Sequence, residues 1–81
     1  MRFPDQVNDD VMKRLRRLEG QIRGVQRMID EGGECRDIVT QLAAARGALD
    51  RVGFKLMAAA MVDPDREATD EELERLFLKL T

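Results

Sequence analysis

Two stretches of apolar residues with heptad spacing constrain this chain more than any other feature of its sequence. The first steps by 4, 3, 4, 3 and 4 positions and consists of Val11, Leu15, Leu18, Ile22, Val25 and Ile29. The second steps by 3 and 4 alternately and consists of Cys35, Ile38, Leu42, Ala45, Leu49, Val52, Leu56 and Ala59. Such spacing places each set on one face of an α-helix. We therefore predict two long helices, over about 8–31 and 35–62.

Residues at the boundaries support these ranges. Asn8 is a plausible N-cap for the first helix. The pair Gly32-Gly33 suits the left-handed turn that follows a helix, and Pro64 cannot continue the second helix. The segment 69–72 (TDEE) is a capping box, which predicts a third, short helix over about 70–80.

A chain of 81 residues forms one small domain, here 1–81, that buries little apolar surface by itself. A hairpin of two long helices leaves much of both apolar stripes open, and a second hairpin closes it into a four-helix bundle. We therefore predict an all-α, three-helix protomer that forms an antiparallel four-helix bundle as a homodimer, or a homotetramer built as a dimer of dimers.

Composition excludes several classes of function. The chain has one cysteine and no histidine, and it carries neither a nucleophile motif nor a P-loop, so we expect neither an enzyme nor a bound cofactor. A single cysteine cannot close an internal disulfide, which fits a reducing compartment. The chain shows no signal-peptide pattern and no apolar run of membrane-spanning length. We expect a cytoplasmic protein without membrane contact.

The net charge of −2 conceals a basic segment in the first helix. Residues 13–27 hold six basic side chains against the single acidic Glu19, whereas 63–81 hold seven acidic side chains against three basic ones. Five of the six lie in one arc of about 120° opposite the apolar stripe, and they are Lys13, Arg16, Arg17, Arg23 and Arg27. Arg14 lies on the flank of this arc. A solvated face normally mixes charges, so the arc favours binding to nucleic acid.

Four segments in order and at matching spacing, 14–25 (RLRRLEGQIRGV), 34–38 (ECRDI), 41–46 (QLAAAR) and 49–52 (LDRV), resemble the copper-sensitive operon repressor family. The resemblance extends from about 11 to 80. It implies an all-α homodimer, usually paired into a tetramer, that represses transcription by binding operator DNA until an effector releases it. It also implies that Arg14 and Arg51 contact DNA, with Lys13, Arg16 and Arg17 as further phosphate partners.

The same resemblance makes Cys35 the effector-sensing residue. Copper-sensing members use this cysteine with a histidine and a second cysteine of the partner chain, whose positions here hold Ala60 and Pro64. In an antiparallel pair centred between residues 47 and 48, Cys35 faces the partner's residue 60, with Met57 and Met61 nearby. A Cu(I) site of Cys35 with a methionine is therefore an alternative, although methionine at helical spacing usually fills a core.

The chain lacks the residues with which other members of the family sense their known effectors. Nickel or cobalt sensing needs imidazoles, and persulfide sensing needs the second cysteine that Pro64 replaces. Formaldehyde sensing needs an N-terminal amine exposed by removal of Met1, and Arg2 in the next position favours retention of that methionine. We expect no metal site. By resemblance, Glu34 and Glu72 match positions that couple the effector site to the DNA-binding face.

Cys35 begins a helix next to Arg36, a setting that makes a thiol reactive, whereas Glu34 and Asp37 oppose this effect. Two interpretations of Cys35 stay open: a reactive sensor, or a small core residue left from a decayed metal site. The leading hypothesis is a transcriptional repressor with a non-metal thiol trigger at Cys35. The alternatives are the Cu(I)-responsive repressor and a helical interaction module that co-assembles with a complete member of the family.

Overall fold

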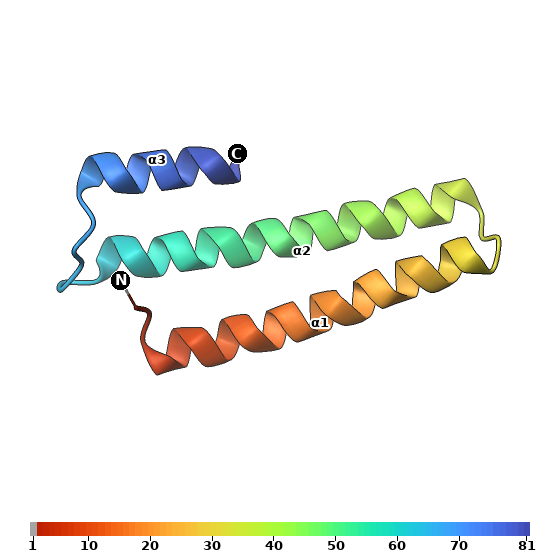
Figure 1. Ribbon diagram of the computed structural model, residues 1–81, viewed down its shortest axis with the longest axis horizontal. Helices are drawn as coiled ribbons and strands as arrows, with labels where there is room; N and C mark the ends of the chain where they lie inside the picture. Colours follow the sequence, from red (N-terminus) through yellow and green to blue (C-terminus); the bar gives the residue numbers. More distant parts are fainter. Residues whose placement is uncertain (1) are drawn as a thin grey trace.

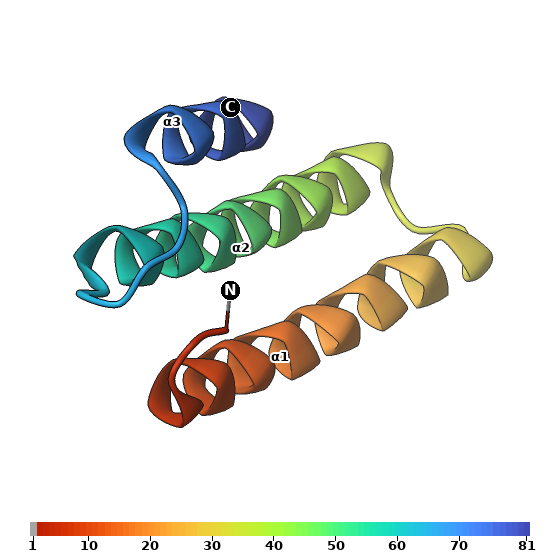
Figure 2. The same ribbon diagram turned by 60° about the vertical axis from the view of Figure 1, so that its left-hand side comes forward.

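The computed structural model describes residues 2–81 as three helices in a single layer. They are α1 (Asp5–Asp30), α2 (Cys35–Val62) and α3 (Asp70–Leu80). In Figures 1 and 2, α2 lies between α1 and α3, and neighbouring helices run antiparallel. The protomer measures 50 × 25 × 13 Å, so it is about one helix thick. The prediction of an all-α, three-helix protomer is confirmed. Met1, on which the expectation about the N-terminal amine depends, lies outside the described residues.

The first helix begins earlier than predicted. Asn8 is not its N-cap: α1 starts at Asp5 and Pro4 occupies the N-cap position without a side-chain cap. The backbone N–H of Asn8 donates to the carbonyl oxygen of Pro4 at 3.0 Å, as in a regular helical turn. Proline has no N–H to satisfy, and an acid in the first turn suits the positive end of the helix dipole. The proline and Asp5 therefore start the helix one turn before the position that a polar cap indicated.

The turn between α1 and α2 depends on two glycines. Gly32 has a φ of +73°, the left-handed region that glycine adopts at little cost. The N–H of Gly33 donates to the carbonyl oxygen of Met28 at 2.7 Å, and that of Gly32 donates to Ile29 at 3.2 Å. This pair of bonds is the Schellman arrangement that closes a helix. A side chain on Gly33 would also lie 3.0 Å from the same Met28 oxygen.

The contact between α1 and α2 uses only part of each apolar stripe. On α1 the buried members are Val11, Leu18 and Val25, seven residues apart, and on α2 they are Ala45 and Val52. The members between them remain at least partly open to solvent, and they include Ile22 (48% exposed), Ile29 (59%), Leu42 (50%) and Leu49 (53%). Within the described chain, no large side chain is fully buried. The protomer therefore keeps an uncovered apolar face.

The short helix α3 packs on the C-terminal half of α2 in its own chain. Its N-cap Thr69 accepts a hydrogen bond from the N–H of Glu72 at 3.1 Å, as the capping box predicted. A small core forms beneath it from Met57, Ala60, Ala68 and Leu73, with Phe3 and Leu76 at its edge. Gly53 makes room at the other end, because a Cβ there would lie 2.9 Å from a methyl group of Leu80. No helix between residues 2 and 81 is long and apolar enough to cross a membrane.

Glycine substitutions should separate the turn from the body of the helix. Replacing Gly32 by alanine forces a side chain into a left-handed conformation, which costs about 1 kcal/mol. Gly24 has no neighbour within 4 Å of an added Cβ and lies inside α1, so Gly24→Ala should stabilise by up to about 1 kcal/mol. Urea unfolding followed by circular dichroism at matched protein concentration measures the change in the free energy of unfolding for both variants. Equal effects of the two variants would contradict this account of the turn.

Candidate nucleic-acid interface and thiol site

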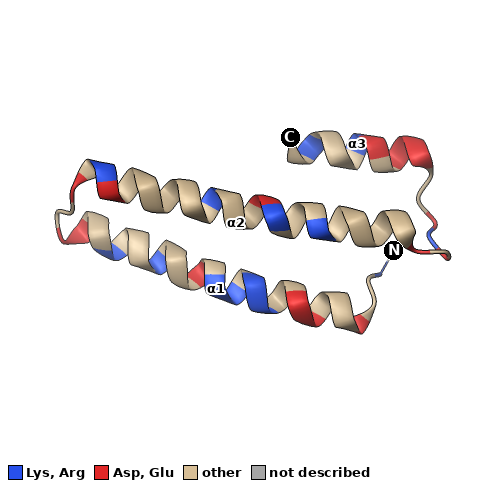
Figure 3. Cartoon of the chain, turned by 180° about the vertical axis from the view of Figure 1, so that it is seen from behind, with Lys and Arg blue, Asp and Glu red and all other residues tan. Residues whose placement is uncertain are grey.

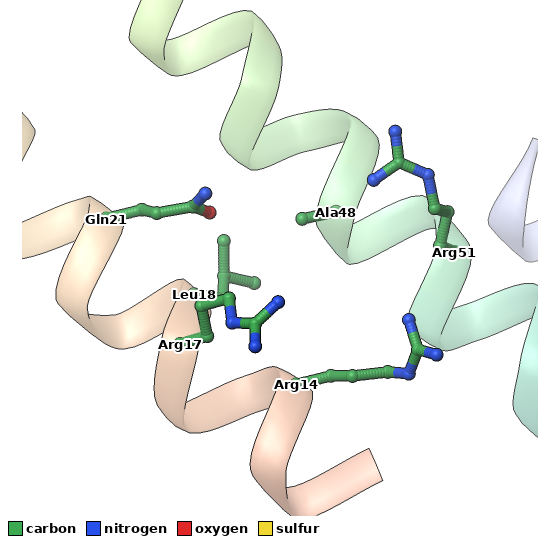
Figure 4. Close-up of a pocket in the computed structure, with 6 residues that line it drawn as sticks. All are labelled: Arg14, Arg17, Leu18, Gln21, Ala48 and Arg51. Atoms are coloured by element: carbon green, nitrogen blue, oxygen red, sulfur yellow. The ribbon is translucent and has the colours of Figure 1, made fainter. Parts of the chain in front are cut away.

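A basic pocket lies between α1 and α2 near the middle of the hairpin. Its volume is about 150 Å³. The helix α1 contributes Arg14, Arg17, Leu18 and Gln21, and α2 contributes Ala48 and Arg51. Figure 4 shows Arg14, Arg17 and Gln21 extending from α1 toward α2, with Ala48 opposite them and the guanidinium group of Arg51 lying along α2. Three arginines from two helices therefore line one small opening, and its lining among the described residues includes no carboxylate.

Helix geometry explains this arrangement. Residues 14, 17 and 21 are spaced by three and four, so they lie along one flank of α1, and residues 48 and 51 lie likewise on α2. Because the helices run antiparallel, the two flanks meet on the same side of the hairpin. The small side chain of Ala48 leaves room for the pocket on the α2 side. The side-chain Oε1 of Gln21 is buried in this region and has no hydrogen-bond partner in the described chain, so the pocket also holds an unsatisfied acceptor.

Asp10 links the two helices at the edge of this surface. Its Oδ2 lies 2.7 Å from Nζ of Lys55 on α2 and 3.4 Å from Nε of Arg14. The hydrogen bond from Lys55, together with the charges of both cations, holds the pKa of the Asp10 carboxyl below its ordinary value of 3.8, outweighing partial desolvation. All three side chains are 39–47% exposed, so the bridge is a surface ion pair.

The structure places the predicted DNA-contacting residues in two groups. Arg14, Arg17 and Arg51 meet at the pocket, whereas Lys13 and Arg16 are exposed on α1 outside it. Arg14 lies on the flank of the basic arc of α1, and Arg51 lies on α2. The charge pattern of α1 alone therefore identifies neither of them. That flank is the side that faces α2. In Figure 3, basic residues appear along the middle of α1 and α2, and acidic ones gather at the start of α3.

Sequence reasoning missed Lys55. It follows Arg51 by four residues and therefore lies on the same side of α2, one turn further along. The i, i+4 spacing of the two basic residues was the available signal. We call the surface formed by Arg14, Arg17, Arg51 and Lys55 the basic groove.

The effector candidate Cys35 lies at the tip of the hairpin. It is a free, exposed thiol and the first residue of α2. Glu34 is the N-cap of this helix, and the two residues line a shallow surface hollow with Arg36 and Asp37. Exposure shows that Cys35 is not part of the protomer core.

The positions that the resemblance gave to further metal ligands are used differently here. Ala60 is only 2% exposed and belongs to the core beneath α3, together with Met57. Met61 is open, at 58% exposure. Along α2, Cys35 and Ala60 are separated by about 37 Å. In the part of the chain that the structure describes, no three His, Cys, Asp or Glu residues come together in a group that could hold a metal ion. Within one protomer, the described residues therefore do not assemble a three-ligand metal site.

Glu34 and Glu72 are far apart in the protomer. Glu34 is next to Cys35, whereas Glu72 lies in the first turn of α3, at the opposite end of α2. Figure 1 shows these two ends at opposite sides of the molecule. A residue of α3 reaches the thiol only from a second chain.

Comparison with known proteins identifies transcriptional repressors as relatives of this chain. A family model described as metal-sensitive transcriptional repressor matches residues 7–79. The copper-sensing transcriptional repressor RicR of Mycobacterium tuberculosis is 48% identical over 52 residues, which cover 64% of this chain and 54% of that protein. The copper-sensing transcriptional repressor CsoR of Bacillus subtilis is 35% identical over 81 aligned positions, covering 90% of this chain and 80% of the relative. No solved structure gives a significant match.

The Asp10 bridge predicts a specific titration. A carboxyl whose pKa is lowered in the folded state stabilises that state above its ordinary pKa of 3.8 and loses this effect as pH falls through the folded value. Carbon NMR of the Asp10 carboxyl should therefore give a midpoint below 3.8. In Lys55→Met, which lacks the main hydrogen-bond donor, the midpoint should rise. An unchanged midpoint in that variant would show that Lys55 does not hold the carboxylate.

Proposed function

The chain belongs to the family of metal-sensitive transcriptional repressors, and we propose that it binds operator DNA through the basic groove and releases it when Cys35 is modified or ligated. Membership of this family confirms the expectation that the chain is not an enzyme. The observation that carries the proposal is that Arg14, Arg17 and Arg51 line one pocket between two helices. The proposed site of action is the cytoplasm, where a bacterial repressor meets its DNA.

Phosphate groups are the ligands that suit the groove. Guanidinium groups bind phosphate oxygens through two parallel N–H donors, and the three arginines have no carboxylate among the described residues that line their pocket. The groove also continues into the exposed basic residues of α1, which include Lys13 and Arg16. A surface of this kind, without a recognition helix of its own, fits recognition of DNA backbone and shape more than of base edges.

The opposite side of the hairpin suits a second copy of the chain. At 100° per residue, Ile22 on α1 and Leu42 and Leu49 on α2 lie on the flank of the contact away from the arginines. A partner hairpin placed there covers the apolar face and supplies the missing second layer of a four-helix bundle. The basic grooves of both chains then stay on the outside. We infer a homodimer, or a homotetramer made of two such dimers, with double-stranded operator DNA as its partner.

A thiol trigger fits the surroundings of Cys35 better than a metal. The thiol is exposed, and the positions of the family's other ligands are a buried alanine and a proline. A thiolate attacks peroxide at oxygen and expels hydroxide, or adds to the carbonyl carbon of an aldehyde, whose oxygen then takes up a proton. Either change adds bulk or polarity at the tip of α2, about 24 Å along the helix from Arg51. Glu34 next to the thiol, and Glu72 of a partner chain, are the proposed coupling residues.

Copper stays as the alternative trigger, because both named relatives are copper-sensing repressors. In a pair of chains it would have to use Cys35 of one chain and the exposed Met61 of the other, because Met57 is buried. Thioethers suit Cu(I) but bind it weakly compared with thiolates. We therefore favour a non-metal trigger.

Loss of an arginine from the pocket should weaken DNA binding in a salt-dependent way. Each phosphate contact contributes about 0.9 to the slope of log affinity against log salt, which is about eightfold in affinity at 0.1 M salt. Arg51→Ala should reduce the DNA affinity about eightfold and the salt slope by about 0.9 for each chain bound. Gel-shift titrations on a DNA fragment from the protein's own promoter at several salt concentrations measure this. Arg75→Ala, an exposed arginine on α3, is the control and should bind as the wild type does. Absence of wild-type binding even at low salt would refute the repressor function.

The trigger can be tested with Cys35→Ser. Wild-type protein bound to DNA is titrated with peroxide, formaldehyde, a persulfide donor or Cu(I), and the fraction of DNA released is measured. We expect release by a thiol-reactive compound in the wild type and no release in Cys35→Ser. Release by Cu(I) alone would support the copper alternative. Equal insensitivity of both proteins to all four would show that Cys35 is not the trigger.

A further inference from the structure

A carboxylate lies at the edge of the basic groove, beside the cations that a DNA phosphate would meet. Asp10 presents one oxygen, Oδ2, to both Lys55 and Arg14, at 2.7 and 3.4 Å. In contrast, within residues 2–81 neither Arg17 nor Arg51 has a carboxylate at ion-pair distance. Two of the four cations of the groove are therefore held internally, and the other two are free.

Asp10 acts on its two partners differently. It contacts Arg14 through Nε only, so the two terminal nitrogens of the guanidinium group stay available at the pocket. The side chain of Lys55 has a single nitrogen, Nζ, and this atom makes the shorter of the two contacts with Asp10. The carboxylate therefore leaves Arg14 able to bind phosphate while it occupies Lys55.

We propose that Asp10 is an internal competitor for phosphate, which holds Lys55 in the free protein and gives it up to the DNA backbone when operator binds. Lys55 then becomes a further phosphate contact beside Arg51, one helical turn away on α2. This inference rests on the proposed DNA-binding function. It adds a residue that limits affinity, Asp10, and a DNA contact, Lys55, that sequence reasoning did not select.

Exposure makes the exchange feasible. The Lys55 and Asp10 side chains are 42% and 39% exposed, and exposed ion pairs contribute little to stability because water and salt screen them. A phosphate that arrives beside Arg51 offers Lys55 an equivalent partner. Without Asp10, the lysine is available from the start and the repulsion between carboxylate and phosphate disappears.

The matched pair Asp10→Asn and Asp9→Asn tests this proposal. Both variants change the net charge by one at neighbouring positions of α1, but Asp9 takes part in no ion pair of the described chain. One further phosphate contact corresponds to about eightfold in affinity at 0.1 M salt and about 0.9 in the salt slope. We expect Asp10→Asn to bind the promoter fragment about eightfold more tightly with a steeper slope. Asp9→Asn should change affinity by less than about twofold with no change in slope.

The role of Lys55 is tested in a Lys55→Met background. If Asp10 acts by occupying Lys55, Asp10→Asn should lose its steeper salt slope there and behave like Asp9→Asn. Equal effects of the two asparagine variants in the wild-type background, or an effect of Asp10→Asn that survives Lys55→Met, would overturn the proposal. In those cases, if Arg51→Ala still weakens DNA binding, the proposed repressor function remains supported. A wild-type chain that binds no DNA would overturn both. Circular dichroism verifies that each variant is folded.

Discussion

The contact between α1 and α2 buries only part of each apolar stripe, and the rest of the structure depends on this division. On α1 the buried positions are Val11, Leu18 and Val25, and the stripe residues between them remain at least partly open to solvent. A layer about 13 Å thick has no interior of its own. Two long helices with a shared seam therefore have two unequal sides, one apolar and one basic. The apolar side is left uncovered within the protomer, and the basic side lies away from it.

The third helix decides what happens at the end of α2. It covers Met57 and Ala60 and makes a small core with Phe3 from the start of the chain. Because Ala60 is enclosed there at 2% exposure, its position serves packing in this chain. The thiol of Cys35 lies at the other end of the helix, exposed and away from Met57, the methionine of its own protomer's small core. The same helix therefore carries a core at one end and an isolated thiol at the other.

The basic groove illustrates how a surface can be strongly charged and still be moderated. Arginines from two helices meet in one pocket, and a single carboxylate at its edge holds two neighbouring cations. An internal carboxylate of this kind reduces the field that an incoming phosphate meets, so affinity is set by competition as well as by attraction.

The sequence by itself determined the three helices and their order, because heptad spacing, the Gly32-Gly33 turn, Pro64 and the Thr69 capping box are local signals. The motifs also predicted the family and the arginines, although Arg14 and Arg51 came from resemblance. Local patterns placed the start of α1 one turn late, since the polar Asn8 was a stronger signal than Pro4. Only the tertiary structure decided which members of each stripe are buried, that Arg51 lines one pocket with Arg14 and Arg17, and that Asp10 reaches Lys55. These facts depend on the relative rotation and register of two helices, which the pattern along one helix does not fix.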